Sequence, residues 1–92
     1  MKQVKAFLLT GCPYCRKARI AYDRLCEDNA EYREVPVEWI MEDEQPEIAD
    51  QYDYFYTPTM YVDEKKVYES HPGEDYEDVL KEVEKVLKAA LA

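Results

Sequence analysis

The stretch Leu8-Leu9-Thr10-Gly11-Cys12-Pro13-Tyr14-Cys15-Arg16-Lys17 decides the fold. We expect a short apolar strand to run into Gly11 and a helix to begin directly after Cys12. Pro13 suits the first helical position, because its fixed φ matches the helix and its missing N–H would have no partner there. The spacing therefore predicts Cys12 as the N-cap residue and Cys15 as the third residue of the helix.

This placement gives the two cysteines different chemistry. A sulfur at a helix N-terminus lies beside unpaired backbone N–H groups and the positive end of the helix dipole, and both favour the reactive thiolate. The i, i+3 spacing brings Cys15 to the same side of the first turn, within reach for a disulfide. We therefore expect Cys12 to act as the nucleophile and Cys15 as the resolving thiol.

A zinc half-site and two incidental cysteines are the alternatives for this pair. Zinc needs about four ligands, and the chain has only Cys26 and His71 left to supply them. Cys26 falls on the apolar stripe of a helix predicted from Pro13 to about Glu27, which favours a packed core thiol. His71 lies in a predicted loop and is expected to be idle. A Cys-x-x-Cys pair near a strand–helix–strand pattern favours redox chemistry without a metal.

Length, composition, net charge and cysteine count limit the number of domains, the partners and the cellular setting that we expect. With 92 residues, 47% of them apolar, we expect one domain over residues 1–92. The net charge of −9 argues against nucleic acid as a partner. We expect no signal peptide and no membrane association, because no apolar segment is long enough. Three cysteines do not make a disulfide scaffold, so a reducing cytoplasmic setting is the expectation. We also expect a monomer.

Charge is distributed unevenly along the chain. Residues 1–22 contain five basic residues and no acidic one, although the whole chain is acidic. Arg16 and Lys17 follow the cysteine pair directly, and nearby cations are expected to lower the pKa of Cys12. The alternative is that they serve solubility only. The acidic run over residues 38–53 is expected to be a solvated helix face.

The remaining pattern predicts alternating strands and helices. Residues 2–9 are apolar on both faces at their end, which is typical of a central strand. A strand over 31–38 would pair parallel with it through a right-handed crossover, with Pro36 at a sheet edge or strand end. The later elements are a short helix from about Pro46, hairpin strands over 59–62 and 67–70, and a helix from Glu74 to about Ala90. Aromatic residues around 52–56 are expected to pack in the core and at its rim.

Two motifs in this order resemble a known family. Cys12-Pro13-Tyr14-Cys15, between a strand and a helix, resembles the dithiol active site of glutaredoxins in the thioredoxin superfamily. Thr57-Pro58, before an apolar strand, is similar to the cis-proline segment that faces the dithiol in that superfamily. The resemblance covers essentially the whole chain. It implies an α/β thioredoxin fold of order β-α-β-α-β-β-α, with a four-stranded mixed sheet and helices on both faces. It also implies that the backbone of Thr57 is free to pair with an extended substrate.

The resemblance further implies a dithiol–disulfide oxidoreductase that binds no cofactor and uses glutathione as co-substrate. Its partners would be disulfide-containing proteins. Tyr14 matches a residue that lines the glutathione groove in the family. Gly73 and Asp75 stand where the family holds the γ-glutamyl end of glutathione. Thr57 and Pro58 complete the implied binding residues.

Two departures from the family pattern leave alternatives open. Leu9 stands where glutaredoxins commonly have a lysine, and Pro72 removes a backbone donor from the turn before the last helix. A thioredoxin-like protein disulfide reductase, recharged by a flavoprotein of the thioredoxin-reductase type, is therefore the second hypothesis. The third is a non-catalytic iron–sulfur carrier bridged across a dimer, which Pro13 disfavours because it restrains the loop.

Overall fold

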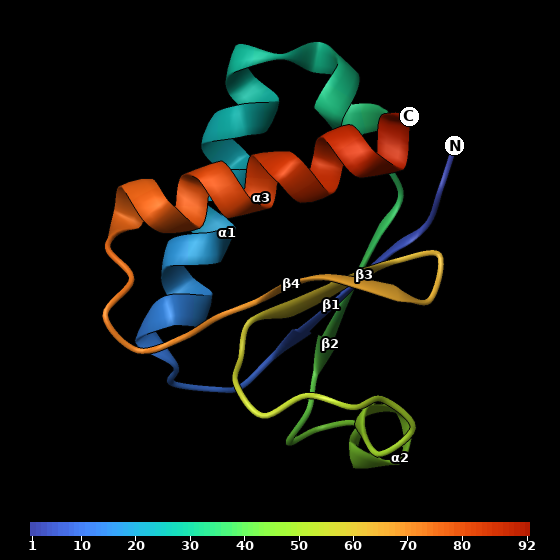
Figure 1. Cartoon of the computed structure of the whole chain (residues 1–92), viewed down its shortest axis with the longest axis vertical. Helices are drawn as coiled ribbons and strands as arrows, with labels where there is room; N and C mark the ends of the chain where they lie inside the picture. Colours follow the sequence, from blue (N-terminus) through green and yellow to red (C-terminus); the bar gives the residue numbers. More distant parts are fainter.

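A four-stranded mixed sheet organises the computed structural model, which describes all residues 1–92 (Figure 1). The strands lie in the order β2-β1-β3-β4, and their bounds are Val4–Leu8 (β1), Val37–Met41 (β2), Thr59–Val62 (β3) and Lys65–Glu69 (β4). β1 pairs parallel with β2 and antiparallel with β3, which pairs antiparallel with β4. The helical elements are α1 (Pro13–Asp28), the 3-10 helix η1 (Ala30–Glu34), α2 (Pro46–Ala49) and α3 (Tyr76–Leu91). The predicted element order and the central position of β1 are confirmed.

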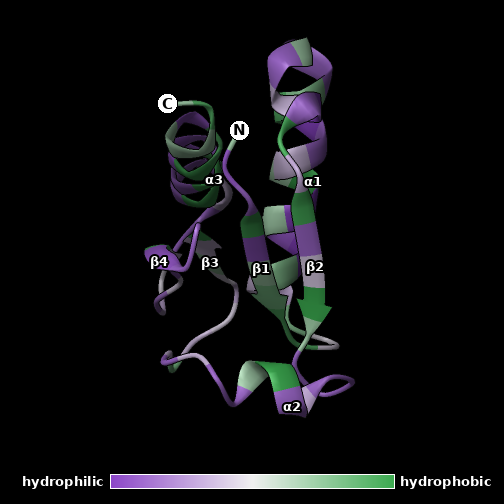
Figure 2. Ribbon diagram, turned by 90° about the vertical axis from the view of Figure 1, so that its right-hand side faces the viewer, coloured by the Kyte–Doolittle hydropathy of each residue, from purple (hydrophilic) through white to green (hydrophobic).

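The two faces of the sheet have separate cores. Val4 and Ala6 of β1 are buried in the larger cluster, which includes apolar residues of α1 and α3. The next residue along β1, Phe7, belongs to a smaller cluster on the α2 side, with Ile40 and Ala49. Figure 2 shows strong hydrophobic colouring where β1 and β2 end, close to α2. Alternation along β1 therefore supplies both cores, as expected for a central strand covered on both faces.

The aromatic segment before β3 divides between the core and the surface. Tyr52 and Tyr54 pack on Phe7, with ring centroids 4.8 and 5.2 Å away. This confirms the predicted core packing for these two residues. Phe55, in contrast, is 89% exposed, and Tyr56 is also exposed.

The strand predicted over residues 31–38 is wrong in its first half. Residues Ala30–Glu34 form η1, and β2 begins only at Val37. The Asn29 side chain accepts a hydrogen bond from Glu31 N at 3.0 Å and caps this turn. Tyr32 is buried and donates its hydroxyl to Glu84 of α3 at 2.8 Å. A local cap and a long-range hydrogen bond therefore override the strand pattern.

Two other boundaries differ from the prediction. β4 begins at Lys65 rather than at Val67, because Asp63 and Glu64 take positive φ values and close the hairpin in two residues. α3 begins at Tyr76 rather than at Glu74, because Asp75 is its N-cap in a capping box with Asp78. None of the helices is long and apolar enough to cross a membrane.

Candidate active site

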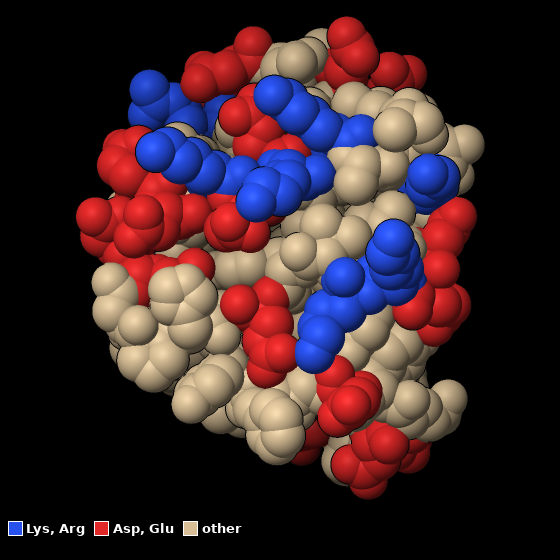
Figure 3. All heavy atoms as spheres, viewed as in Figure 1, with Lys and Arg blue, Asp and Glu red and all other residues tan.

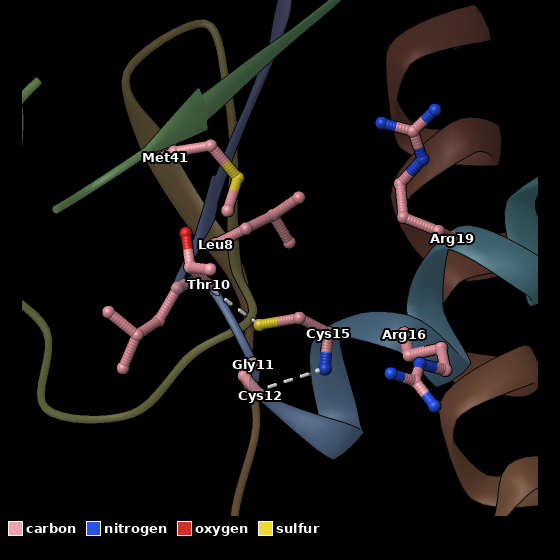
Figure 4. Close-up of a pocket in the computed structure, with 9 residues that line it drawn as sticks. Leu8, Thr10, Gly11, Cys12, Cys15, Arg16, Arg19 and Met41 are labelled. Atoms are coloured by element: carbon pink, nitrogen blue, oxygen red, sulfur yellow. Dashed lines mark hydrogen bonds between the residues drawn. The ribbon is translucent and has the colours of Figure 1, made fainter. Parts of the chain in front are cut away.

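Cys12 and Cys15 lie at the first turn of α1, which follows the end of β1 after a short connection (Figure 4). Gly11, with φ at +79°, makes the turn between strand and helix. Cys12 is the N-cap residue, as predicted, and its sulfur accepts a hydrogen bond from Cys15 N at 3.2 Å. Cys15 is only 5% exposed, and its sulfur accepts a hydrogen bond from Leu9 N at 3.5 Å. One sulfur is thus reachable, and the other lies beneath it.

Thr57 faces the dithiol from the segment before β3. The Thr57–Pro58 peptide bond is cis, as the resemblance implies. The Thr57 hydroxyl donates to the Cys12 sulfur at 3.6 Å, and the Cys12 thiol donates to the Thr57 carbonyl oxygen at 3.6 Å. Sequence reasoning assigned only the backbone of Thr57 to the site. Its hydroxyl contact was missed, because no local pattern shows which side chain faces Cys12.

The surroundings push the pKa values of the two thiols apart. Burial raises the pKa of Cys12, but hydrogen bonds from Cys15, Thr57 and nearby backbone N–H groups outweigh it and lower the pKa below its usual value. Burial first, and then the neighbouring Cys12 sulfur, raise the pKa of Cys15 to about 12. The half-buried Cys12 therefore forms a thiolate more readily than an ordinary cysteine, and the buried Cys15 keeps its proton.

Neither the Arg16 nor the Lys17 side chain hydrogen-bonds to Cys12, and the effect of these two cations on its pKa stays a prediction. Neither cation is among the leading causes of the shifted pKa of Cys12. Lys17 instead donates to the backbone oxygen of Glu74 at 3.2 Å and lies over the Tyr14 ring. Arg16 is exposed and forms no ion pair. The leading causes that lower the pKa of Cys12 are hydrogen bonds.

Tyr14 joins the start of α1 to the loop before α3. Its hydroxyl accepts a hydrogen bond from Gly73 N at 3.0 Å, so these two predicted binding residues lie together. Asp75 is exposed, but its carboxylate accepts from Asp78 N at 2.9 Å as the helix cap. No hydrogen bond joins Asp75 to Tyr14, Thr57 or the cysteines. The structure therefore joins Tyr14 to Gly73 and places Thr57, which precedes Pro58, against the Cys12 sulfur.

Two glutamates that the sequence did not single out hold the loops around the site. The Glu69 carboxylate accepts from the backbone N–H groups of Phe55 and Tyr56 at 2.6 and 2.9 Å. Glu74 has a side chain only 1% exposed, and it accepts hydrogen bonds from Tyr68, Ser70 and His71 N. His71 itself is exposed, and its Nε2 lies 3.8 Å from this carboxylate. Sequence reasoning placed Glu74 at the start of the last helix, which gives no sign of burial.

The other candidate positions behave as core or surface. Cys26 is buried in the larger cluster, as predicted. No group of three His, Cys, Asp or Glu side chains is arranged to hold a metal ion. A cavity of about 290 Å³ opens beside the dithiol, and its walls include both cysteines and apolar side chains from β1 and β2.

Comparisons with known proteins agree with this geometry. The family model described as glutathione S-transferase, N-terminal domain, matches residues 7–72. A solved structure described as a malarial protein superimposes with a TM-score of 0.63 at 15% identity, covering 95% of this chain and 98% of the other. A mutant thioredoxin from Halobacterium salinarum NRC-1 gives a TM-score of 0.58 at 20% identity, covering 94% of this chain and 74% of the other. No curated protein matches the sequence.

The predicted α/β thioredoxin fold, with its four-stranded mixed sheet, is thereby confirmed. Its Cys-x-x-Cys pair stands at the start of α1. Because the family match covers more than half of its residues, the chain belongs to the family of glutathione S-transferase N-terminal domains.

Proposed function

We propose that the protein is a dithiol–disulfide oxidoreductase of the glutaredoxin type, with Cys12 as the nucleophile and Cys15 as the resolving thiol. The observation that carries this proposal is the opposite environment of the two sulfurs. Cys12 accepts helix N-terminal and Thr57 hydrogen bonds that stabilise a thiolate, whereas Cys15 is buried and keeps its proton. A thiolate attacks disulfides and a thiol does not, so the order of the two steps follows from this difference.

The reaction transfers two electrons from the dithiol to the substrate. The Cys12 thiolate attacks one sulfur of the substrate disulfide, the S–S bond breaks, and the leaving thiolate takes a proton from water. Cys15 then loses its proton to water and attacks the Cys12 sulfur of the mixed disulfide. The bond between Cys12 and the substrate sulfur breaks, the second substrate sulfur leaves as a thiolate that takes a proton from water, and a Cys12–Cys15 disulfide remains. The mixed disulfide no longer carries the Cys12 thiolate, so one cause of the raised pKa of Cys15 is removed before this step.

Glutathione is the proposed reductant of the oxidised dithiol. Two molecules of glutathione supply the two electrons and leave as glutathione disulfide. Tyr14 and Gly73 would line the groove on one side of Cys12, with Thr57 and Pro58 opposite and Asp75 at the γ-glutamyl end. In the thiolate state Cys12 no longer donates to the Thr57 carbonyl, so that oxygen becomes available to a substrate N–H.

A second candidate is a protein disulfide reductase recharged by a flavoprotein rather than by glutathione. It is favoured by the engagement of the Asp75 carboxylate in the α3 capping box, which competes with a role in holding glutathione. The apolar Leu9 near the dithiol favours it too, since glutathione is anionic. Both candidates use the same Cys12 and Cys15 chemistry and differ only in the electron donor.

Turnover of a glutathione mixed disulfide, coupled to glutathione reductase, separates the two candidates. We expect activity in the wild type and in Cys15→Ser, because glutathione itself can resolve the intermediate, and no activity in Cys12→Ser. Cys26→Ser is the control, since that thiol belongs to the core. Absence of glutathione-dependent turnover, with insulin still reduced by the dithiothreitol-charged protein, would assign the function to the second candidate.

Asp75 needs a pair of variants, because it also caps a helix. Asp75→Asn keeps a good N-cap and removes the charge, whereas Asp75→Ala removes both. A raised KM for the glutathione substrate in Asp75→Asn would support the proposed γ-glutamyl contact. An unchanged KM in a folded Asp75→Asn variant would exclude it.

A further inference from the structure

The cavity beside the dithiol is distinct from the proposed glutathione groove. Its volume is about 290 Å³, and its walls include Cys12 and Cys15. The groove residues Tyr14, Thr57 and Gly73 do not line it. Cys12 therefore borders two binding regions. The cavity shares the two cysteines and Leu9 with the site described above, and its other lining residues have no part in the function proposed there.

Two arginines of α1 line this cavity, one helical turn apart. Arg16 and Arg19 are both exposed, and neither forms an ion pair with a carboxylate. The Arg19 guanidinium stacks over the Trp39 ring, 4.1 Å from its centroid, and Tyr22 packs edge-on against the same ring. Stacking occupies the face of the guanidinium and leaves the N–H donors at its edge free. Arg19 is thus oriented before any ligand arrives, which reduces the entropy cost of binding.

The opposite wall of the cavity comes from the sheet and is largely apolar. Leu8 and Met41 contribute from the ends of β1 and β2, and Leu9 is exposed beside them. Figure 4 shows Leu8 and Met41 across from the arginines, with Cys15 between the two walls. The only carboxylate bonded to a lining residue is that of Asp43, which accepts from Thr10 N at 3.3 Å. The cavity therefore offers two cationic donors, an apolar wall and a reactive sulfur.

We propose that this cavity docks disulfide-bearing protein substrates through an acidic side chain that lies beside an apolar residue close to the substrate cysteine. The inference rests on the proposed disulfide reductase function and adds a substrate class to it. Arginine binds carboxylates through paired, charge-assisted hydrogen bonds, which fix orientation as well as affinity. An apolar neighbour of the acidic residue would cover Leu9 and Met41.

The charge of the whole molecule makes positive charge beside the cysteines unusual on this surface. All acidic residues lie after position 22, and the net charge is −9. Figure 3 shows acidic side chains over much of the rim of the face seen in Figure 1. An acidic substrate segment is repelled by most of this surface, and Arg16 and Arg19 supply unpaired positive charge directly beside the two cysteines.

The test compares two disulfide-linked peptide dimers that differ in charge alone. Both carry a leucine near the cysteine, and the flanking glutamates of the first are glutamines in the second. We expect wild-type kcat/KM to be about tenfold higher for the glutamate peptide. In R16Q/R19Q this ratio should fall to about one. The ratio cancels any change in Cys12 reactivity, because the same nucleophile attacks both peptides.

K81Q/K88Q is the matched control. It also removes two exposed, unpaired positive charges from a helix, but α3 residues do not line the cavity. We expect it to keep the wild-type ratio. A wild-type ratio of about one, or an equal loss in both double variants, would overturn the inference while leaving disulfide reduction intact.

A binding measurement keeps the inference testable if neither peptide is reduced, an outcome that would contradict the proposed function itself. Fluorescence anisotropy would then compare monomeric peptides, with serine in place of the cysteine, on the Cys12→Ser protein. Tighter binding of the glutamate peptide, lost when R16Q/R19Q is added, would support the docking site. Equal binding of the two peptides would refute it.

Discussion

The Thr57 hydroxyl donates a hydrogen bond to the Cys12 sulfur across 3.6 Å, joining residues 45 positions apart in the chain. The contact adds a side-chain donor to the backbone N–H groups that the helix N-terminus already offers. A donor aimed at sulfur favours the thiolate, because the charged form is the better acceptor. The cis-proline segment therefore tunes the nucleophile as well as facing it.

Replacing Thr57 by valine should make Cys12 less acidic. Loss of one hydrogen bond to a charged group costs about 1 kcal/mol, so the pKa of Cys12 should rise by roughly 0.5–1 unit. The rate of Cys12 alkylation by iodoacetamide as a function of pH, with the site identified by mass spectrometry, measures this change. Thr57→Ser keeps the hydroxyl and should titrate close to the wild type. A Thr57→Val profile that matches the wild type would show that the hydroxyl does not act on Cys12.

Glu69 should be required to hold the segment that carries Thr57. Its carboxylate accepts two backbone N–H groups, and Glu69→Ala leaves both without this partner at a cost of about 1–3 kcal/mol. We expect lower stability in urea unfolding and slower Cys12 alkylation. Glu69→Gln retains a carbonyl acceptor and should recover most of both. Loss of stability in Glu69→Ala without any change in Cys12 reactivity would restrict Glu69 to a structural role.

The lowered pKa of Cys12 predicts a pH-dependent stability of the reduced protein. Hydrogen bonds from Cys15 and Thr57 outweigh burial in lowering it, so the folded state loses this proton at a lower pH than the unfolded state. The unfolded state then binds more protons, and the free energy of unfolding rises with pH. Relative to Cys12→Ser, the free energy of unfolding of the wild type should begin to rise near the pKa of Cys12 in the folded protein. The rise should be complete at about pH 8.5, the ordinary pKa of a thiol. Acidification through the folded pKa should remove it.

Urea unfolding of the reduced wild type and of Cys12→Ser, from pH 5 to pH 8.5, measures this difference. The folded Cys15 thiol, with its pKa raised to about 12 by burial first and then by Cys12, stays protonated throughout this range. Parallel curves for the two proteins would contradict a stabilised thiolate at Cys12.

Glu74 should be a stability determinant rather than a reacting group. Its buried carboxylate accepts the hydroxyls of Tyr68 and Ser70, and truncation would leave both donors unsatisfied. We expect Glu74→Ala to lower the free energy of unfolding by about 2–4 kcal/mol. The exposed Glu77 of the same helix is the control, and Glu77→Ala should change stability by less than about 0.5 kcal/mol. Equal effects of the two substitutions in urea unfolding would contradict the assignment.

Local rules account for the parts of the site that lie within one turn of chain. Pro13 and the spacing of Cys12 and Cys15 predict an N-cap sulfur and a second sulfur within disulfide reach, because N-terminal helix geometry depends on neighbouring residues alone. The start of α2 at Pro46 follows in the same way. The strand predicted over residues 31–38 fails where a distant residue intervenes, since Tyr32 is held by Glu84 of α3.

The sequence by itself determined the order of elements, the central strand and the positions of both cysteines. Each of these depends on periodicity or on spacing within a few residues. Only the tertiary structure decided that Thr57 reaches Cys12, that Glu69 holds the loop before it, and that Arg19 stacks on Trp39. These contacts join segments far apart in the chain, and which partners meet depends on how the sheet and helices pack. The acidity and the surroundings of the dithiol are therefore properties of the fold, whereas its location is a property of the motif.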